Sequence, residues 1–109
     1  MRDQAVFAAI GDPTRREIVD LLAKRGAMTA TEMDDHFPLT RQAVVKHLRV
    51  LESAGIAVSE RCGNEVFYAL QPGSLSKATA WLERVGTSWD RRLSALDKHL
   101  SAKPKRAVR

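Results

Sequence analysis

Three polar side chains spaced along one predicted helix are the residues of this chain best suited to chemistry. Gln42, Lys46 and Arg49 follow one another at intervals of four and three residues within the segment from Thr40 to Ile56. This spacing places them on one side of a helix. An amide can both donate and accept hydrogen bonds at a base edge, and cationic side chains can bind guanine or phosphate oxygens. The pattern therefore favours contact with a nucleic acid.

The helix that carries these side chains has a predicted buried side and predicted ends. Val44, Leu48 and Leu51 have the i, i+4, i+7 spacing of a buried stripe. Thr40 offers a side-chain oxygen at the N-cap, and Gly55 stands where a left-handed residue would end the helix. We predict that one face packs against the protein while the opposite face can enter a DNA groove.

Three shorter helices are predicted before this one. The first closes at Gly11, and the second begins after an Asp12 N-cap and ends at Gly26. A capping-box pattern that starts at Thr29 predicts a third helix over residues 30–36. A short turn then leads into the helix described above, so the two form a helix-turn-helix.

The period of the apolar residues changes after Gly55. Val66, Tyr68 and Leu70 alternate with other residues behind the pair Gly63–Asn64, which predicts a two-stranded hairpin, or wing. From about Pro72 a long helix is predicted. The fold class is therefore mainly α with a small β-hairpin: a winged helix-turn-helix with a long C-terminal dimerisation helix. We expect residues 1–102 to form one DNA-binding and dimerisation domain, followed by a basic, disordered tail over residues 103–109.

The long helix carries apolar residues at intervals of three and four over more than three heptads. So long a stripe exceeds what a helix inside a small domain usually needs, and we predict a two-fold homodimer. The alternative is a monomer in which the helix folds back over its own core. The predicted dimer interface comprises Val6, Ile10, Leu75, Ala78, Leu82, Val85, Trp89, Leu93, Leu96 and Leu100.

The net charge of +5 is weaker support for nucleic-acid binding than it seems. Four of the 18 lysine and arginine residues lie in the tail 103–109, which contains no acid, so the rest of the chain is close to neutral against 13 acidic residues. The predicted wing carries Glu60, Arg61 and Glu65 and is locally acidic. Recognition must then depend mainly on the helix.

The N-terminal part of a recognition helix lies deepest in the major groove. Gln42 is suited to adenine, and Val45 to a thymine methyl group. Thr29, Thr31 and Arg49 are expected to bind phosphates. The predicted DNA-binding residues are Thr29, Thr31, Thr40, Arg41, Gln42, Val45, Lys46, Arg49 and Arg61.

Three segments in this order resemble the ArsR-type bacterial winged-helix repressors. GDPTRREIVDLL is similar to that family's second helix, AVVKHLRVLESAGI to its recognition helix, and VSERCGNEVFYAL to its wing, so that the resemblance extends to about Leu100. It implies a homodimeric repressor that binds an inverted-repeat operator in double-stranded DNA, in some cases over its own promoter. Such a repressor releases the DNA when an effector or a condition changes, and the effector is unknown here.

The family's metal sites have no full counterpart in this chain. The stretch from Glu32 to His36 lacks the thiols of the metal-sensing members, and Asp97 with His99 resembles only half of another zinc site. We therefore predict no metal and no cofactor. His47 is expected at the edge of the core. A redox role for Cys62 stays an alternative, as does a metal-responsive repressor.

The remaining signals exclude other classes. A single cysteine cannot form an internal disulfide and fits a reducing compartment. The N-terminal apolar run is too short for a signal peptide or a membrane span, so we expect a cytoplasmic protein without membrane contact. No catalytic motif is present, and no enzyme is predicted. The main alternative function is a winged helix used for protein contact without an operator.

Overall fold

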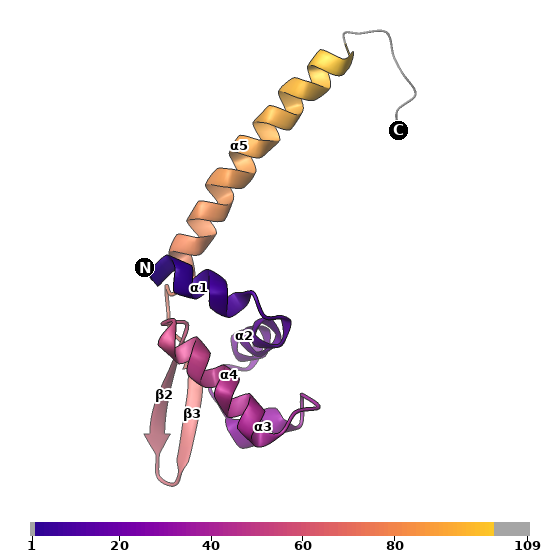
Figure 1. The fold of residues 1–109 in the computed structure, drawn as a ribbon. Coiled ribbons are helices and arrows are strands. Elements are labelled where there is room, and N and C mark those ends of the chain that lie inside the picture. Colours follow the sequence, from indigo (N-terminus) through magenta and orange to yellow (C-terminus); the bar gives the residue numbers. More distant parts are fainter. Residues whose placement is uncertain (1, 102–109) are drawn as a thin grey trace. The chain divides into compact units, whose positions relative to one another are not determined.

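The computed structural model describes residues 2–101, and the predicted basic tail at residues 103–109 lies outside them. The predicted helices and the predicted hairpin follow one another in the expected order, and one short strand, β1 (Met28–Thr29), is added to them (Figure 1). They are α1 (Arg2–Ile10), α2 (Pro13–Arg25), β1 (Met28–Thr29), α3 (Ala30–Asp34), α4 (Arg41–Ser53), β2 (Ala57–Cys62), β3 (Glu65–Leu70) and α5 (Ser76–Ser101). The chain divides into two compact units, the first ending at Ala78 and the second beginning at Thr79.

The predicted start of α2 and the predicted start and end of α4 are confirmed. Asp12 caps α2, with Pro13 in its first turn. The Oγ1 atom of Thr40 accepts a hydrogen bond from the Ala43 amide at 3.1 Å and so starts α4. Gly55 follows the end of α4 with a φ of +80°, a conformation that side-chain-bearing residues rarely adopt. These local signals fix where the helices begin and end.

The capping box before α3 is also present, but α3 is shorter than predicted. The Thr29 Oγ1 accepts from the Glu32 amide at 3.1 Å, and the Thr29 amide donates to Glu32 Oε1 at 2.9 Å. The helix ends at Asp34 rather than at His36. The amide of His36 donates to the Met33 carbonyl, which closes a tight turn in place of another helical turn. The start was predictable from two residues, whereas the predicted end was two residues too late.

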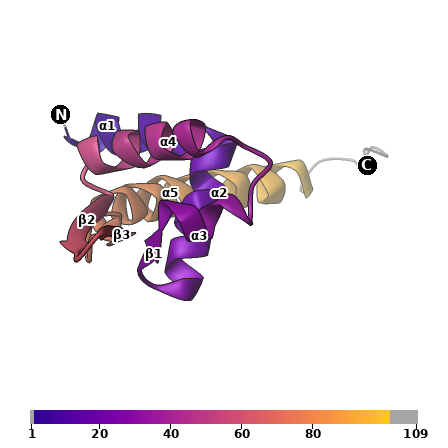
Figure 2. The ribbon, with the colours of Figure 1, turned by 90° about the horizontal axis from the view of Figure 1, so that it is seen from below.

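The core of the first unit gathers apolar side chains from all of its helices. The largest fully buried side chains are Ile18, Leu22, Met33, Val44, Leu48, Leu51 and Ile56. Helix α1 packs against both α2 and α4, and Figure 2 shows it alongside α4. The position of α4 is therefore set by apolar contacts on one side along most of its length.

The wing is a three-stranded antiparallel sheet with the strand order β1-β3-β2, not a hairpin alone. The predicted hairpin is confirmed, with Cys62 paired to Glu65 across the turn Gly63–Asn64. The two-residue strand β1 pairs Met28 with Tyr68 and was missed. Two residues are too few to show the alternation that predicts a strand, and pairing with β3 alone defines it.

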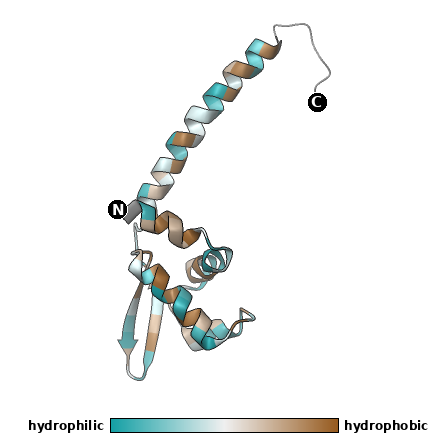
Figure 3. Ribbon diagram, in the orientation of Figure 1, coloured by the Kyte–Doolittle hydropathy of each residue, from teal (hydrophilic) through white to brown (hydrophobic). Residues whose placement is uncertain are grey.

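The long helix α5 starts at Ser76, later than the predicted Pro72. A turn comes first: Gly73 has a φ of +76°, and the Ser76 amide donates to the Gly73 carbonyl. Ala78 belongs to the buried core, whereas residues 79–100 are exposed. Figure 3 shows hydrophobic and hydrophilic residues interspersed along α5. Within residues 2–101, no helix has the length and hydrophobicity needed to span a membrane.

Candidate nucleic-acid interface

Helix α4 separates its residues into a buried and an exposed side as predicted. Val44, Leu48 and Leu51 are fully buried. Gln42, Lys46 and Arg49 are exposed, and within residues 2–101 their side chains make no hydrogen bond or ion pair. Val45 is half-buried between them. The unengaged polar groups are therefore free to bind a ligand, while the buried stripe holds the helix in place.

Arg41, at the start of α4, is bonded to α3. Its Nε donates to Oδ2 of Asp34 at 2.7 Å, and the arginine side chain remains half exposed. The ion pair spans the turn of the helix-turn-helix and uses one of the arginine's three nitrogens. The second carboxylate oxygen, Asp34 Oδ1, is buried without a hydrogen-bond partner among the described residues. Arg41 therefore braces the turn, and its terminal nitrogens remain for contact with a phosphate.

Thr29 does not fit the predicted role of phosphate contact. It is only 7% exposed, and its hydroxyl is occupied as the N-cap of α3. A residue that is buried and hydrogen-bonded inside the protein cannot also reach a DNA backbone. Thr31, two residues later, is exposed, so it stays a predicted phosphate contact. Thr29 is thus a correction to the predicted DNA-binding set.

The register of the wing separates its charges onto two faces. Residues paired across strands share a face, and so do residues two positions apart on one strand. Cys62 pairs with Glu65, so Glu60, Cys62 and Glu65 lie on the same face of the hairpin. Arg61 lies on the opposite face, paired with Val66, and donates to the Gly63 carbonyl at 3.4 Å. The one wing cation is therefore separated from the two acids, and only its face suits a phosphate.

Four residues of the predicted dimer interface are covered by the first unit of the chain itself. Val6 and Ala78 are buried in the core of the first unit, and Ile10 and Leu75 are partly buried against it. These four residues already have partners within the chain. From Leu82 onward the apolar residues of α5 remain between 45% and 57% exposed; they are Leu82, Val85, Trp89, Leu93, Leu96 and Leu100.

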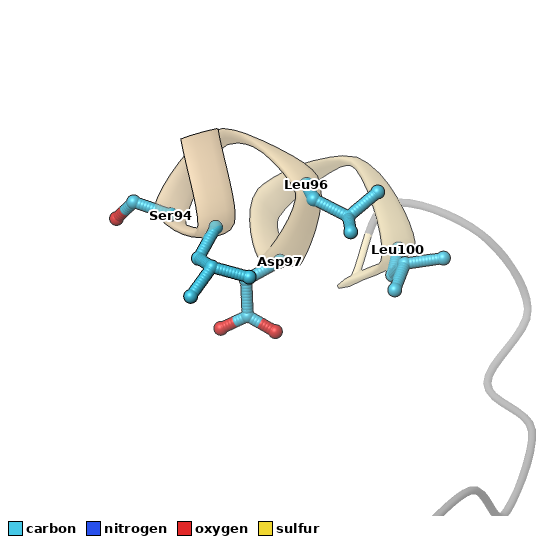
Figure 4. Close-up of a pocket in the computed structure, with 5 residues that line it drawn as sticks. Ser94, Leu96, Asp97 and Leu100 are labelled. Carbon is cyan, nitrogen blue, oxygen red and sulfur yellow. The ribbon is translucent and has the colours of Figure 1, made fainter. Parts of the chain in front are cut away.

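Trp81 is a further large exposed side chain on α5, 46% exposed, which the predicted interface omitted. Trp81 directly precedes Leu82 in the sequence, and this position could have suggested it as part of the interface. A shallow pocket near the end of α5 is lined by Leu93, Ser94, Leu96, Asp97 and Leu100. Figure 4 shows the Leu96, Asp97 and Leu100 side chains standing out from the helix. The leucine-bearing side of this helix is thus apolar near its end, with Ser94 and Asp97 at its margin.

The predicted sites for other chemistry stay dispersed. Cys62 is exposed at the wing tip. Among the described residues, no group of three or more histidine, cysteine, aspartate or glutamate side chains is placed to hold a metal ion. The polar side chains that the structure gathers closely are instead Asp12, Arg15 and His47, where α2 meets α4.

Comparison with known proteins agrees with this geometry. A family model described as a helix-turn-helix domain matches residues 10–60, which contain α2 to α4. The transcriptional repressor SdpR of Bacillus subtilis is 39% identical over 77 residues, covering 71% of this chain and 84% of that protein. The HTH-type transcriptional regulator Rv2034 of Mycobacterium tuberculosis is 35% identical over 81 residues, covering 74% and 75%.

A solved structure is similar over nearly the whole length. The ArsR-like transcriptional regulator from Rhodococcus sp. RHA1 has 36% sequence identity and a TM-score of 0.72. The match covers 94% of this chain and 95% of that one. The likeness therefore includes the helix-turn-helix, the wing and most of α5.

Proposed function

Since the chain belongs to the ArsR-type family of winged helix-turn-helix transcriptional regulators, we propose that it is a homodimeric repressor that binds an inverted-repeat operator. The chain is a DNA-binding regulator and not an enzyme. The exposed, unpaired face of α4 is the observation that carries the proposal, because it presents Gln42, Lys46 and Arg49 opposite a fully buried stripe.

Each proposed contact follows from the chemistry of its side chain. Gln42 and Val45 read base edges, and Lys46 reaches guanine or a phosphate. Thr40 and Arg41 act at the start of the helix, while Thr31, Arg49 and Arg61 bind the backbone and set the register. Because Arg61 stands alone against two wing acids, we expect the wing to contribute less than α4. We propose that the tail 103–109 supplies further charge to the DNA.

The spacing of apolar residues on α5 supports a two-fold dimer. Val85 and Leu93 stand four positions before and after Trp89, and Leu82 and Leu96 stand seven positions before and after it. In two antiparallel helices related by an axis beside Trp89, each residue faces the one equally far on the other side. Leu82 then meets Leu96, Val85 meets Leu93, and Trp89 meets its own copy. We propose this pairing as the core of the dimer interface.

The compartment follows from the partner. A regulator that reads double-stranded DNA acts where the DNA is, so we propose a cytoplasmic protein. No effector is proposed, because the geometry favours none.

Binding to DNA from upstream of the protein's own gene tests this function. Wild-type protein should bind the labelled fragment with an affinity that falls steeply as salt rises, since phosphate neutralisation releases counterions. The double variant Gln42→Ala/Arg49→Ala should lose specific binding. Ser53→Ala, on an exposed residue at the far end of α4, is the matched control and should bind like wild type. Equal binding by all three proteins, with a flat salt response, would instead favour the protein-contact alternative.

A further inference from the structure

A polar junction joins α1, α2 and α4 at the middle of the proposed recognition helix. Arg15 of α2 donates from Nε to the Ala9 carbonyl at 2.6 Å and from a terminal nitrogen to the Ala8 carbonyl at 3.4 Å. Its other terminal nitrogen lies 3.4 Å from Nδ1 of His47 on α4. Asp12 completes the junction, with Oδ2 lying 3.5 Å from that same Nδ1 and 3.8 Å from Arg15.

The chemistry of the two side chains fixes the direction of the bond between them. A guanidinium has only donors, so Nδ1 of His47 must be the acceptor. In this contact the imidazole proton is assigned to Nε2. Asp12 stands beside the arginine as its counter-ion and also accepts from the Arg15 amide as N-cap of α2. Arg15 is therefore held at several points before it reaches α4.

Arg15 is placed to act on α4 and not on DNA. Its side chain is only 19% exposed, and each of its three nitrogens already faces a partner within the first unit. It supplies a donor to the Ala9 carbonyl at the end of α1, where carbonyls lack helical partners, whereas the Ala8 carbonyl also accepts from the Gly11 amide. The guanidinium of Arg15 therefore has few free donors for a phosphate, in contrast to that of Arg49.

The contact with His47 fixes the rotation of α4 about its own axis, which the buried stripe fixes less strictly. Apolar burial is non-directional, so Val44, Leu48 and Leu51 hold the helix against the core without strictly fixing its rotation. A hydrogen bond has a preferred direction and length. His47 follows Lys46 directly and is itself 23% exposed, so an anchor at His47 fixes the rotation of the reading face. Base readout needs such accuracy, because a misplacement of about 1 Å weakens a designed contact.

We propose that Arg15 is a positioning residue for operator binding, which acts through His47 to hold α4 at a fixed rotation relative to the end of α1. The proposal rests on α4 being the recognition helix. It assigns Arg15 and His47 to DNA affinity although neither touches DNA.

Substitutions at the two ends of the bond test it, with binding to the upstream DNA fragment as the readout. Arg15→Met keeps the length of the side chain but removes its donors, and should bind about tenfold more weakly. His47→Leu should lose a similar factor. His47→Asn keeps an acceptor close to the position of Nδ1 and should recover most of the affinity. The double variant Arg15→Met/His47→Leu should bind no more weakly than the weaker single variant, because the two substitutions break the same contact between Arg15 and His47.

The salt dependence separates positioning from direct contact. Arg15→Met should keep the wild-type slope of affinity against salt, whereas Arg49→Ala, the matched control, should reduce that slope by about one. Circular dichroism checks that each variant is folded, and if Arg15→Met does not fold, the comparison of His47→Leu with His47→Asn decides alone.

Three results would overturn the inference while leaving the proposed function intact: additive losses in the double variant, a reduced slope in Arg15→Met, or equal affinity for His47→Leu and His47→Asn. Failure of the wild-type protein to bind the fragment would instead refute the proposed function, and the inference with it.

Discussion

Gln42 carries more of the proposed recognition than any cation of α4. An amide can donate and accept at one adenine, whereas a lysine or arginine can spend its charge on any phosphate. Gln42 is exposed and stands in the first turn of the helix, where a recognition helix lies deepest in the groove. Sequence discrimination at one base pair should therefore depend on this residue alone.

Replacement of Gln42 by alanine should flatten the preference for that base. We expect a loss of about 1–3 kcal/mol in affinity for the operator and little change for DNA substituted at the contacted position. Fluorescence anisotropy with both DNA sequences measures the difference. Equal losses on both sequences would show that Gln42 does not read a base.

Thr29 has the opposite character, since it serves the fold. Thr29→Ala should lower the free energy of unfolding by about 1 kcal/mol, because the amide of Glu32 loses its cap. Thr29→Ser keeps the hydroxyl and should restore most of this stability in urea denaturation. The slope of DNA affinity against salt should be the same for both variants and wild type. A shallower slope in Thr29→Ala would show that Thr29 contacts a phosphate despite its burial.

What the sequence predicted for single residues depended on whether the cause was local. The capping roles of Thr40 and Asp12 were predictable because both partners lie within a few residues. The exposed side of α4 was predictable from its period. The junction of Arg15 with His47 was not, because 32 positions separate them and only the packing of α2 on α4 brings them together.

At the scale of elements, the exit of α4 into the wing depends on Gly55. Its φ of +80° is unfavourable for a residue with a Cβ, although no atom lies within 4 Å of where that Cβ would be. The strain is therefore in the backbone itself and not in a collision with neighbours. Gly55 stands between the end of α4 at Ser53 and the start of β2 at Ala57.

Gly55→Ala should therefore destabilise the fold by about 1 kcal/mol, measured by urea denaturation. Gly55→Asn should cost less, because asparagine tolerates the left-handed region better than alanine does. Should alanine prove as stable as asparagine, the helix must end in another conformation in solution.

Elements that carry a signal in their own sequence were predicted, whereas a strand that depends on pairing with a distant strand was not. The hairpin was marked by alternation and by Gly63–Asn64, and α4 by its caps. Strand β1 depends on β3 for its identity, and its two residues carry no period. The start of α5 was misplaced because Pro72 is compatible with a helix start, while the turn at Gly73 delays it.

At the scale of the whole molecule, the exposed apolar face of α5 is the feature that supports the proposed dimer. Large side chains that remain about half exposed over several helical turns are characteristic of an interaction site. The sequence predicted this face but included Val6 and Ala78, which the first unit buries itself. Periodicity shows which residues are apolar on one side, and it cannot show whether the same chain already covers them.

Trp89→Glu should dissociate the dimer, because it places a charge at the centre of the proposed α5 pairing. Analytical ultracentrifugation should detect a monomer at concentrations where wild type is dimeric. Thr87→Glu, a charge change on the polar side of the same helix, is the control and should remain dimeric. If Trp89→Glu sediments like wild type, the interface lies elsewhere.

The most direct test of a dimeric reader is a footprint on the DNA upstream of the protein's own gene. We predict a two-fold symmetric protected site whose half-sites are centred about one helical turn apart, near 34–36 Å. The protection should disappear with Gln42→Ala/Arg49→Ala. A protected site without two-fold symmetry, or protection that persists in the double variant, would contradict the account.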